Sequence, residues 1–115
     1  MSRKPLLIVR YNVNPNHDEK FNEYYNKKIP RILEAVPEII SGKRLVMERK
    51  GVKEYYTIYE IESEDKIESC MTNIPDTQEW KDWVESSVTH LDNGVFKVIC
   101  SYKKENGKIV ENKED

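Results

Sequence analysis

The sequence has few of the residues from which metal, redox and nucleotide sites are usually built. Its 115 residues include two cysteines, two histidines and four glycines. The cysteines, Cys70 and Cys100, are far apart and lack Cys-x-x-Cys spacing, so we expect two buried thiols. The scattered glycines form no phosphate-binding loop, and two distant histidines form no ligand pair. We therefore expect neither a metal nor another cofactor.

The charges and the apolar runs exclude further classes. Lysine and arginine number 19 against 21 aspartates and glutamates, without a basic patch, so nucleic acid is not an expected partner. The longest apolar run, Leu6–Val9, is far too short for a membrane span. The first residues lack the pattern of a signal peptide. We therefore expect a cytoplasmic protein that does not bind membranes.

The first half of the chain shows a clear alternation of elements. Branched aliphatic residues predict a strand over residues 6–13. Apolar residues at three- and four-residue steps predict a helix over residues 17–36, with Asn16 as its N-cap. Strands are predicted over residues 40–49 and 54–61, joined by a turn at Lys50-Gly51.

The second half repeats the order of helix and strand. Ser63 opens a helical region that Pro75 interrupts and Asp76 caps again, and its apolar stripe continues to Leu91. Asn93-Gly94 then turns the chain into a last strand over residues 95–102. Residues 1–104 thus form one predicted domain, and residues 105–115 form a polar, flexible tail.

The order strand, helix, strand, strand, helix, strand predicts a ferredoxin-like α+β fold. Such a fold has a four-stranded antiparallel sheet with both helices on one face. The outer segments are apolar on both faces, so residues such as Leu6, Ile8, Val95 and Ile99 would be left in water. A second copy of the chain is the simplest cover. We therefore expect a homodimer packed through the open sheet face.

Strand alternation also predicts which residues share each face of the sheet. On the helix side we place Leu7, Val9, Tyr11, Val13, Phe96, Val98 and Cys100. On the open side we place Ile8, Arg10, Asn12, Arg44, Tyr56, Glu60, Lys97 and Ile99. Glu60 could form an ion pair with Arg10 or Lys97, or the same polar groups could bind a small ligand.

The segment FNEYYNKKIPRILEAV carries a resemblance to a known family. Its Phe21, Tyr24, Tyr25 and Pro30, followed by Val36-Pro37 and by Gly42-Lys43-Arg44, resemble the EthD-like families of the dimeric α/β-barrel superfamily. The resemblance implies a barrel cavity beside the first helix, with Tyr25 and Lys28 near its mouth. Pro30 lacks the amide that would bond back to Asn26, so we expect the helix to kink or restart there.

The chain departs from the family pattern at its histidine. That position holds Lys28 if Pro30 is equated with the family proline, and Ile29 if the alignment runs without a gap from Phe21. Neither residue is an imidazole, so a histidine-based proton transfer does not carry over. A lysine could act as the base only if burial lowered its pKa.

The remaining candidates are aromatic and titratable residues near the end of the second helical region. His90 is the predicted acid or base, because its ordinary pKa lies near neutrality. Trp80 and Trp83 share its apolar stripe and could stack on a planar ligand, while Tyr25 or Arg44 holds the oxygens of that ligand. The predicted function is binding of a small molecule, as an accessory enzyme on an aromatic or quinone-like compound. The alternative is a non-catalytic ligand-binding or structural dimer.

Overall fold

Four antiparallel strands form one sheet in the computed structural model, which describes residues 4–112. These strands are β1 (Leu6–Val13), β2 (Ile39–Arg49), β3 (Val52–Ile61) and β4 (Val88–Phe96). Their order across the sheet is β2-β3-β1-β4, so the first strand of the chain is flanked by β3 and by the last strand of the sheet. Residues 1–3 of the predicted domain lie outside the described residues.

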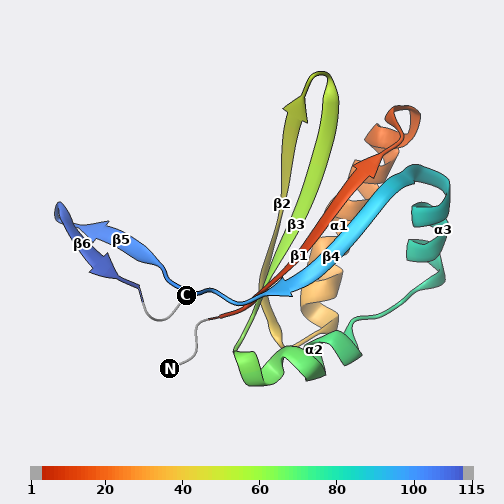
Figure 1. Ribbon diagram of the computed structural model, residues 1–115. Helices are drawn as coiled ribbons and strands as arrows, with labels where there is room; N and C mark the ends of the chain where they lie inside the picture. The colour runs from red at the N-terminus through yellow and green to blue at the C-terminus, as the bar shows by residue number, and fades with distance from the viewer. Residues whose placement is uncertain (1–3, 113–115) are drawn as a thin grey trace.

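The helices lie together on one face of this sheet (Figure 1). They are α1 (Asp18–Ala35), α2 (Ile67–Asn73) and α3 (Gln78–Ser87). A short 3-10 turn precedes α1 at Pro15–His17, and another precedes α2 at Glu64–Lys66. The predicted ferredoxin-like α+β class is therefore confirmed. Within the described residues, no helix combines the length and the apolar character that a bilayer span requires.

Helix α1 follows the apolar stripe of its sequence but does not break at its proline. Phe21, Tyr25 and Ile32 are buried along its inner side. Pro30 lies inside the helix with its side chain exposed, and the predicted restart there is not found. Because the proline ring faces solvent while the inner side is held by packing, the loss of one backbone donor does not end the helix.

The β2–β3 hairpin has the predicted two-residue turn. Lys50 and Gly51 both have positive φ, at 53° and 79°, which is the geometry of a type I′ turn. Further along β2, Gly42 is paired with Tyr59. A Cβ atom at Gly42 would come within 3.1 Å of the side chain of Ile29 on α1. Glycine at this position therefore lets α1 pack closely against the sheet.

The second helical region is divided as predicted, but its cap and its end differ from the prediction. The side chain of Thr77, not that of Asp76, accepts the hydrogen bond from the amide of Trp80 and caps α3. Helix α3 ends at Ser87, although the apolar stripe of the sequence continues to Leu91. The amide of Asn14 donates to the carbonyl of Ser87, which ties the end of α3 to the end of β1.

Strand β4 begins at Val88, seven residues before the predicted start at Val95. Asn93 and Gly94, predicted as a turn, lie within the strand opposite Val9 and Ile8 of β1. Pairing along the whole length of β1 stabilises this strand more than local helix or turn preferences could. The prediction that His90 lies on a helix is therefore wrong.

The same shift reverses the predicted faces of the last strand. Val95 packs against the core under the helices, whereas Phe96 is 53% exposed on the open side. A one-residue change of parity moves each side chain to the other face of a strand. Val98, Ile99 and Cys100 lie beyond β4, and Cys100 is exposed rather than buried. Cys70 is buried, as predicted.

The polar end of the chain forms a short hairpin. Strands β5 (Tyr102–Glu105) and β6 (Lys108–Glu111) pair antiparallel and extend away from the sheet and helices (Figure 1). Asn106 and Gly107 form the turn with positive φ, as Lys50 and Gly51 do in the other hairpin. Residues 113–115 of the predicted tail lie outside the described residues.

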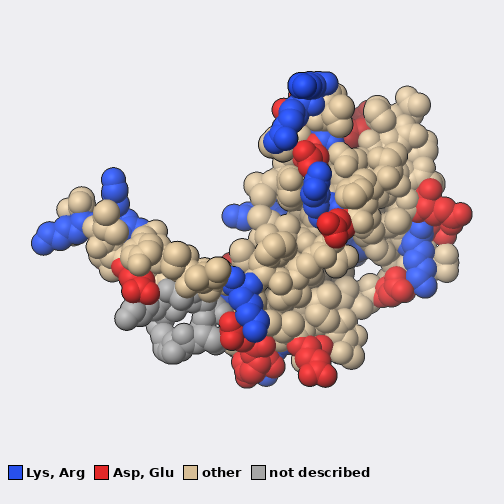
Figure 2. All heavy atoms as spheres, in the orientation of Figure 1, with Lys and Arg blue, Asp and Glu red and all other residues tan. Residues whose placement is uncertain are grey.

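The face of the sheet opposite the helices carries both apolar and charged side chains. Arg10 and Glu54 form an ion pair of 2.6 Å on this face. Around this pair lie half-buried or exposed apolar side chains, namely Leu6, Ile8, Leu45, Met47, Tyr56, Ile58 and Phe96. In Figure 2 charged atoms gather mainly at the edges of the molecule, and neutral atoms form most of its centre. This face also carries further charges, since Asp92 lies opposite Arg10, Glu60 opposite Leu6 and Lys43 opposite Ile58.

The observed cap of α3 predicts a specific change in stability. Thr77→Ala removes the side-chain acceptor for the Trp80 amide and should lower the free energy of unfolding by about 1 kcal/mol. Thr77→Ser keeps the oxygen and should preserve most of the stability. Asp76→Ala breaks only an exposed contact with Lys81 and should have a smaller effect. Urea unfolding of the three variants would contradict the assignment if Asp76→Ala proved the most damaging.

Candidate functional site

A cluster of aromatic rings fills the space between α1, α3 and the sheet. Tyr11 of β1 is completely buried and stacks on Tyr25 of α1, with ring centroids 5.2 Å apart, and on Tyr55 of β3 at 5.6 Å. Phe21 meets Tyr11 edge to face at 5.9 Å. Trp80 meets Tyr25 edge to face at 5.5 Å, which joins α3 to the cluster. Stacked and edge-to-face contacts of this kind fix ring orientations.

Arg44 of β2 closes one side of this cluster. Its Nε donates to the hydroxyl of Tyr11 at 2.8 Å, and its two terminal nitrogens donate to the side-chain oxygens of Asn26 and Asn22, each at 2.7 Å. The guanidinium carbon also lies 4.7 Å from the ring centroid of Tyr25. Because its donors are directed to protein acceptors, Arg44 joins β1, β2 and α1.

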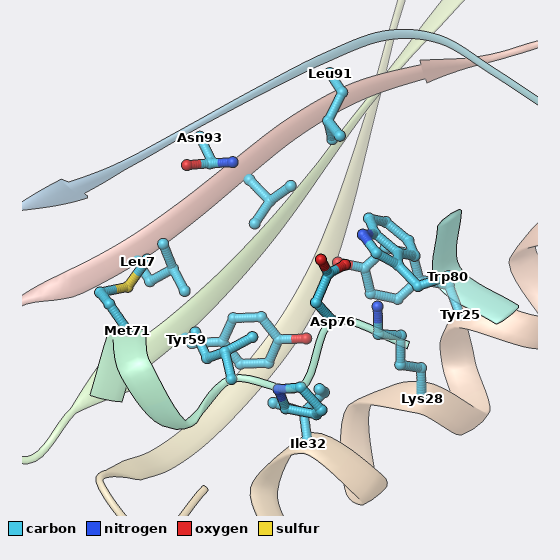
Figure 3. A pocket seen from close by; sticks show the side chains of 13 residues that line it. Leu7, Tyr25, Lys28, Ile32, Tyr59, Met71, Asp76, Trp80, Leu91 and Asn93 are labelled. Atoms are coloured by element: carbon cyan, nitrogen blue, oxygen red, sulfur yellow. The ribbon is translucent and has the colours of Figure 1, made fainter. Parts of the chain in front are cut away.

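A pocket lies between α1, the α2–α3 connection and the helix face of β1 and β4 (Figure 3). Its volume is about 250 Å³. The walls are mainly apolar and aromatic, formed by Leu7, Val9, Tyr25, Ile32, Tyr59, Met71, Ile74, Pro75, Trp80 and Leu91. Lys28, Asp76 and Asn93 add polar groups to this lining. An apolar concavity with a few polar groups is the usual form of a small-molecule site.

Lys28 enters the pocket from the inner side of α1. It follows Tyr25 by three residues and precedes Ile32 by four, so it occupies the buried stripe of the helix. Its Nζ lies 3.4 Å from the centroid of the Trp80 ring and 5.6 Å from that of Tyr25. Figure 3 shows the amine pointing toward Trp80 and Asp76. The cation is thus held against aromatic faces rather than in open solvent.

Burial controls the ionisation of this lysine. Loss of solvent around the amine lowers the pKa of Lys28 to about 8, although the negative charges of Asp76 and Glu79 act in the opposite direction. Within the described residues, no carboxylate forms an ion pair with Lys28. Asp76 instead lies 3.4 Å from Lys81. Lys28 therefore meets the requirement, stated from the sequence, that burial must lower its pKa.

The pKa values of the tyrosines around the pocket are raised, so these tyrosines stay protonated. Burial raises the pKa of Tyr25 to about 12, against the opposing effect of hydrogen bonds with Thr57 and Tyr59. Burial also raises the pKa of Tyr59, and the neighbouring Tyr25 adds to the increase. In Figure 3 the hydroxyl of Tyr59 points toward the region of Lys28. At neutral pH these tyrosines are therefore uncharged phenols.

The structure brings together some of the predicted site residues. Tyr25 and Lys28 line one pocket between α1 and the sheet, and their place at the mouth of a barrel cavity stays a prediction. Arg44 lies on the helix face next to Tyr25, not on the open face where alternation along β2 had placed it. Trp83 stacks on Tyr24 at 5.1 Å, in the groove between α1 and α3, outside the lining of this pocket.

Other predicted site residues lie on the opposite face of the sheet. Arg10 and Tyr56 share the open face as predicted, but Arg10 pairs with Glu54, not with Glu60. Glu60 accepts a hydrogen bond from Ser41 instead. His90 is exposed on β4 opposite Asn12, so it does not share a pocket with Tyr25. The role of His90 as an acid or base stays a prediction.

Tyr59 and Asp76 are polar lining residues that the sequence did not identify as site residues. The alternation along β3 predicts which face of the sheet Tyr59 occupies, but it does not predict that Tyr59 lies close to α1. Asp76 was interpreted as a cap and lies at the edge of the pocket because Pro75 separates α2 from α3. Trp80 had been assigned to the apolar stripe, and its partner Lys28 belongs to another helix. No local pattern links these residues.

Comparisons with known proteins agree on the fold and give no function. No protein-family model matches the chain, and no curated protein sequence matches it. The fold is similar to that of PA3566 from Pseudomonas aeruginosa, with a TM-score of 0.67, 12% identity, and coverage of 86% of this chain and 97% of that one. It is also similar to an uncharacterized NIPSNAP-like domain protein from Burkholderia xenovorans, with a TM-score of 0.60, 12% identity, and coverage of 86% and 88%.

The lowered pKa of Lys28 predicts a pH-dependent stability. Between about pH 8 and pH 10.5 the unfolded chain binds more protons at this residue than the folded chain does. The free energy of unfolding should therefore rise with pH in this window, relative to Lys28→Met. Urea unfolding at several pH values measures the difference, with Lys27→Met as the control. A difference independent of pH would show that Lys28 has an ordinary pKa.

Proposed function

We propose that the pocket at Lys28 binds a small, planar, mainly apolar molecule that carries an acidic oxygen. A phenol, a hydroquinone or an enol has this character, which agrees with the aromatic or quinone-like compound predicted from the sequence. The observation that carries the proposal is the amine of Lys28 in an apolar pocket without an ion-pair partner among the described residues. A desolvated cation of this kind is stabilised when an anion binds beside it.

The shape and chemistry of the walls support a planar ligand. Trp80, Tyr25 and Tyr59 offer aromatic surfaces, and Leu7 and Ile32 offer aliphatic ones. The hydroxyl of Tyr59, which burial keeps protonated, is hydrogen-bonded to Tyr25, and it would turn from Tyr25 to donate to a ligand oxygen. The ligand oxygen would thus face Lys28 and Tyr59, while its ring packs against the apolar walls.

The ionisation of Lys28 also supports proton transfer as the associated chemistry. A general base works best when its pKa lies near the working pH. With a pKa of about 8, the neutral amine can accept a proton from a bound phenol or enol, which an ordinary lysine does poorly. This would make the protein an accessory enzyme in which Lys28 performs the role first considered for His90. In the alternative, a ligand-binding protein without catalysis, the ligand would occupy the same pocket.

The open face of the sheet supports a homodimer, as in the dimeric α/β barrels that the sequence resembles. Ile8, Tyr56, Ile58 and Phe96 form the apolar part of this surface, with the Arg10–Glu54 ion pair at its centre and Asp92 opposite Arg10. A second copy placed sheet to sheet would remove these side chains from water. Arg10 and Glu54 would then be buried together, so neither of them would be an isolated buried charge.

The ligand proposal predicts that affinity for an anion depends on Lys28. Wild-type protein should bind para-nitrophenolate at least about tenfold more tightly than Lys28→Met, a difference of about 1.4 kcal/mol. Lys27→Met is the matched control, since Lys27 is an exposed neighbour paired with Glu23. Para-nitroanisole, which cannot ionise, should bind both variants equally. Titration calorimetry that gave equal phenolate affinities would remove Lys28 from the proposed site.

The dimer proposal predicts a change of mass in solution. Wild-type protein should sediment as a dimer at micromolar concentration, and Ile8→Asp should sediment as a monomer because the new carboxylate would be buried without a partner. Thr72→Asp, on the exposed outer side of α2, should remain dimeric. A wild-type monomer, or a dimeric Ile8→Asp variant, would contradict packing through this face.

A further inference from the structure

In its neutral form, the amine of Lys28 is a nucleophile as well as a base. We propose that Lys28 forms a reversible imine with an aldehyde or ketone that binds in the pocket between α1, α3 and β1. This inference rests on the proposed function, because it needs the same pocket and the same class of planar, mainly apolar molecule. It adds a covalent reaction and a carbonyl group as the reacting part of the ligand.

The surroundings of Lys28 carry the proposal. The Nζ atom lines a pocket of about 250 Å³ and lies 3.4 Å from the centroid of the Trp80 ring. Among the described residues it has no carboxylate within ion-pair distance that would hold it as an ammonium. The aromatic walls exclude part of its solvent, which favours the uncharged form. Desolvated lysines in apolar pockets are the usual imine-forming residues.

Lys27, one position away on the same helix, has different surroundings from Lys28. Its side chain is 66% exposed, and its Nζ lies 3.6 Å from a carboxylate oxygen of Glu23 on the same helix. Lys27 is thus both open to solvent and paired with a carboxylate. Lys28 faces inward between Tyr25 and Ile32, so burial reduces its contact with solvent, although the charges of Asp76 and Glu79 remain nearby. Helix geometry thus separates a nucleophilic lysine from an ordinary one.

The reaction needs no oxidant, reductant or metal. The lone pair of Lys28 attacks the carbonyl carbon, the carbon–oxygen π bond breaks, and a proton moves from nitrogen to oxygen to give a carbinolamine. The carbinolamine then loses its hydroxyl group with a second proton as water, and the carbon–nitrogen double bond forms. The net change is amine plus carbonyl to imine plus water, and hydrolysis reverses it.

Nearby groups can move the protons in these two steps. Asp76 lies at the exposed edge of the pocket, where its carboxylate can exchange protons with solvent. Tyr59 and Tyr25 line the inner wall as phenols that can donate hydrogen bonds to the carbonyl oxygen. Glu79 of α3 adds negative charge that favours the protonated lysine. The pH dependence of imine formation should therefore reflect Lys28 together with Asp76, Glu79 and the two tyrosines.

Reductive trapping tests the inference. The full-length protein is incubated with para-hydroxybenzaldehyde, reduced with borohydride, and digested for peptide mass spectrometry. We expect one reduced adduct, mainly on Lys28, formed at least about tenfold faster than on Lys27, as expected from the larger neutral fraction of Lys28 near pH 8. Lys28→Arg keeps the positive charge but should abolish this adduct, and Lys27→Arg should leave it unchanged.

A second measurement separates the covalent step from binding. Para-hydroxybenzyl alcohol has the ring of the aldehyde but no carbonyl, and its binding can be followed by the change in tryptophan fluorescence, since Trp80 lines the pocket and Trp83 does not. An excess of the alcohol should suppress trapping at Lys28 and leave slow labelling of exposed lysines unaffected. This competition uses only wild-type protein, so it remains decisive if Lys28→Arg fails to fold.

The outcomes distinguish the two proposals. If the alcohol binds but the aldehyde labels exposed lysines and Lys28 equally, the imine inference is wrong and the binding site remains. If neither compound changes the fluorescence and no adduct forms at Lys28, the binding site at this pocket is wrong as well. Preferential trapping at Lys28 that the alcohol suppresses would support both.

Discussion

The burial of a single phenol, that of Tyr11, governs how the layers of this protein meet. A buried hydroxyl must have hydrogen-bond partners, and Tyr11 finds them in Thr57 at 3.2 Å and in Arg44 at 2.8 Å. Arg44 can reach Tyr11 only from the helix face of β2, where its other nitrogens bind two asparagines of α1. The ring of Tyr11 stacks on Tyr25, which comes from the same helix. The buried side chain of Tyr11 therefore fixes how close α1 lies to the sheet and how α1 is rotated about its own axis.

The position of α1 in turn determines the chemistry of the pocket. With Tyr25 held against the sheet, Lys28 projects from the next turn toward the space under the α2–α3 connection. Pro75 separates the two short helices, so Trp80 approaches Lys28 from the side and covers its amine. The low pKa of Lys28 is a consequence of this covering, because the aromatic surface replaces water that would stabilise the charge. The aromatic packing that positions α1 is therefore also the packing that buries the amine of Lys28.

The sequence predicted the first half of the fold closely, since local and tertiary preferences agree there. The strands around Leu7 and Tyr59, the stripe of α1 and the turn at Lys50-Gly51 were read from alternation, helical spacing and a glycine. The second half was misplaced because the stripe of α3 continues past Ser87 in sequence, while pairing with β1 makes those residues a strand. The prediction placed Lys28 beside a cavity with Tyr25. It also named Trp80 as a stacking surface for a planar ligand held by Tyr25 or Arg44. It did not place Asp76 there, because the approach of Asp76 depends on how the helices pack rather than on a local pattern.

The central position of the first strand has a consequence for the order in which the chain can fold. Strand β1 leaves the ribosome before the other strands of the sheet, but one of its two neighbours is β4, which ends at Phe96. Until those late residues are available, one edge of β1 and the apolar residues Leu7 and Val9 lack part of their cover. Contacts between distant parts of a chain form slowly because the intervening loop must first be closed. During synthesis the nascent chain must therefore carry an unpaired strand edge for most of its length, a state in which association with other chains competes with folding.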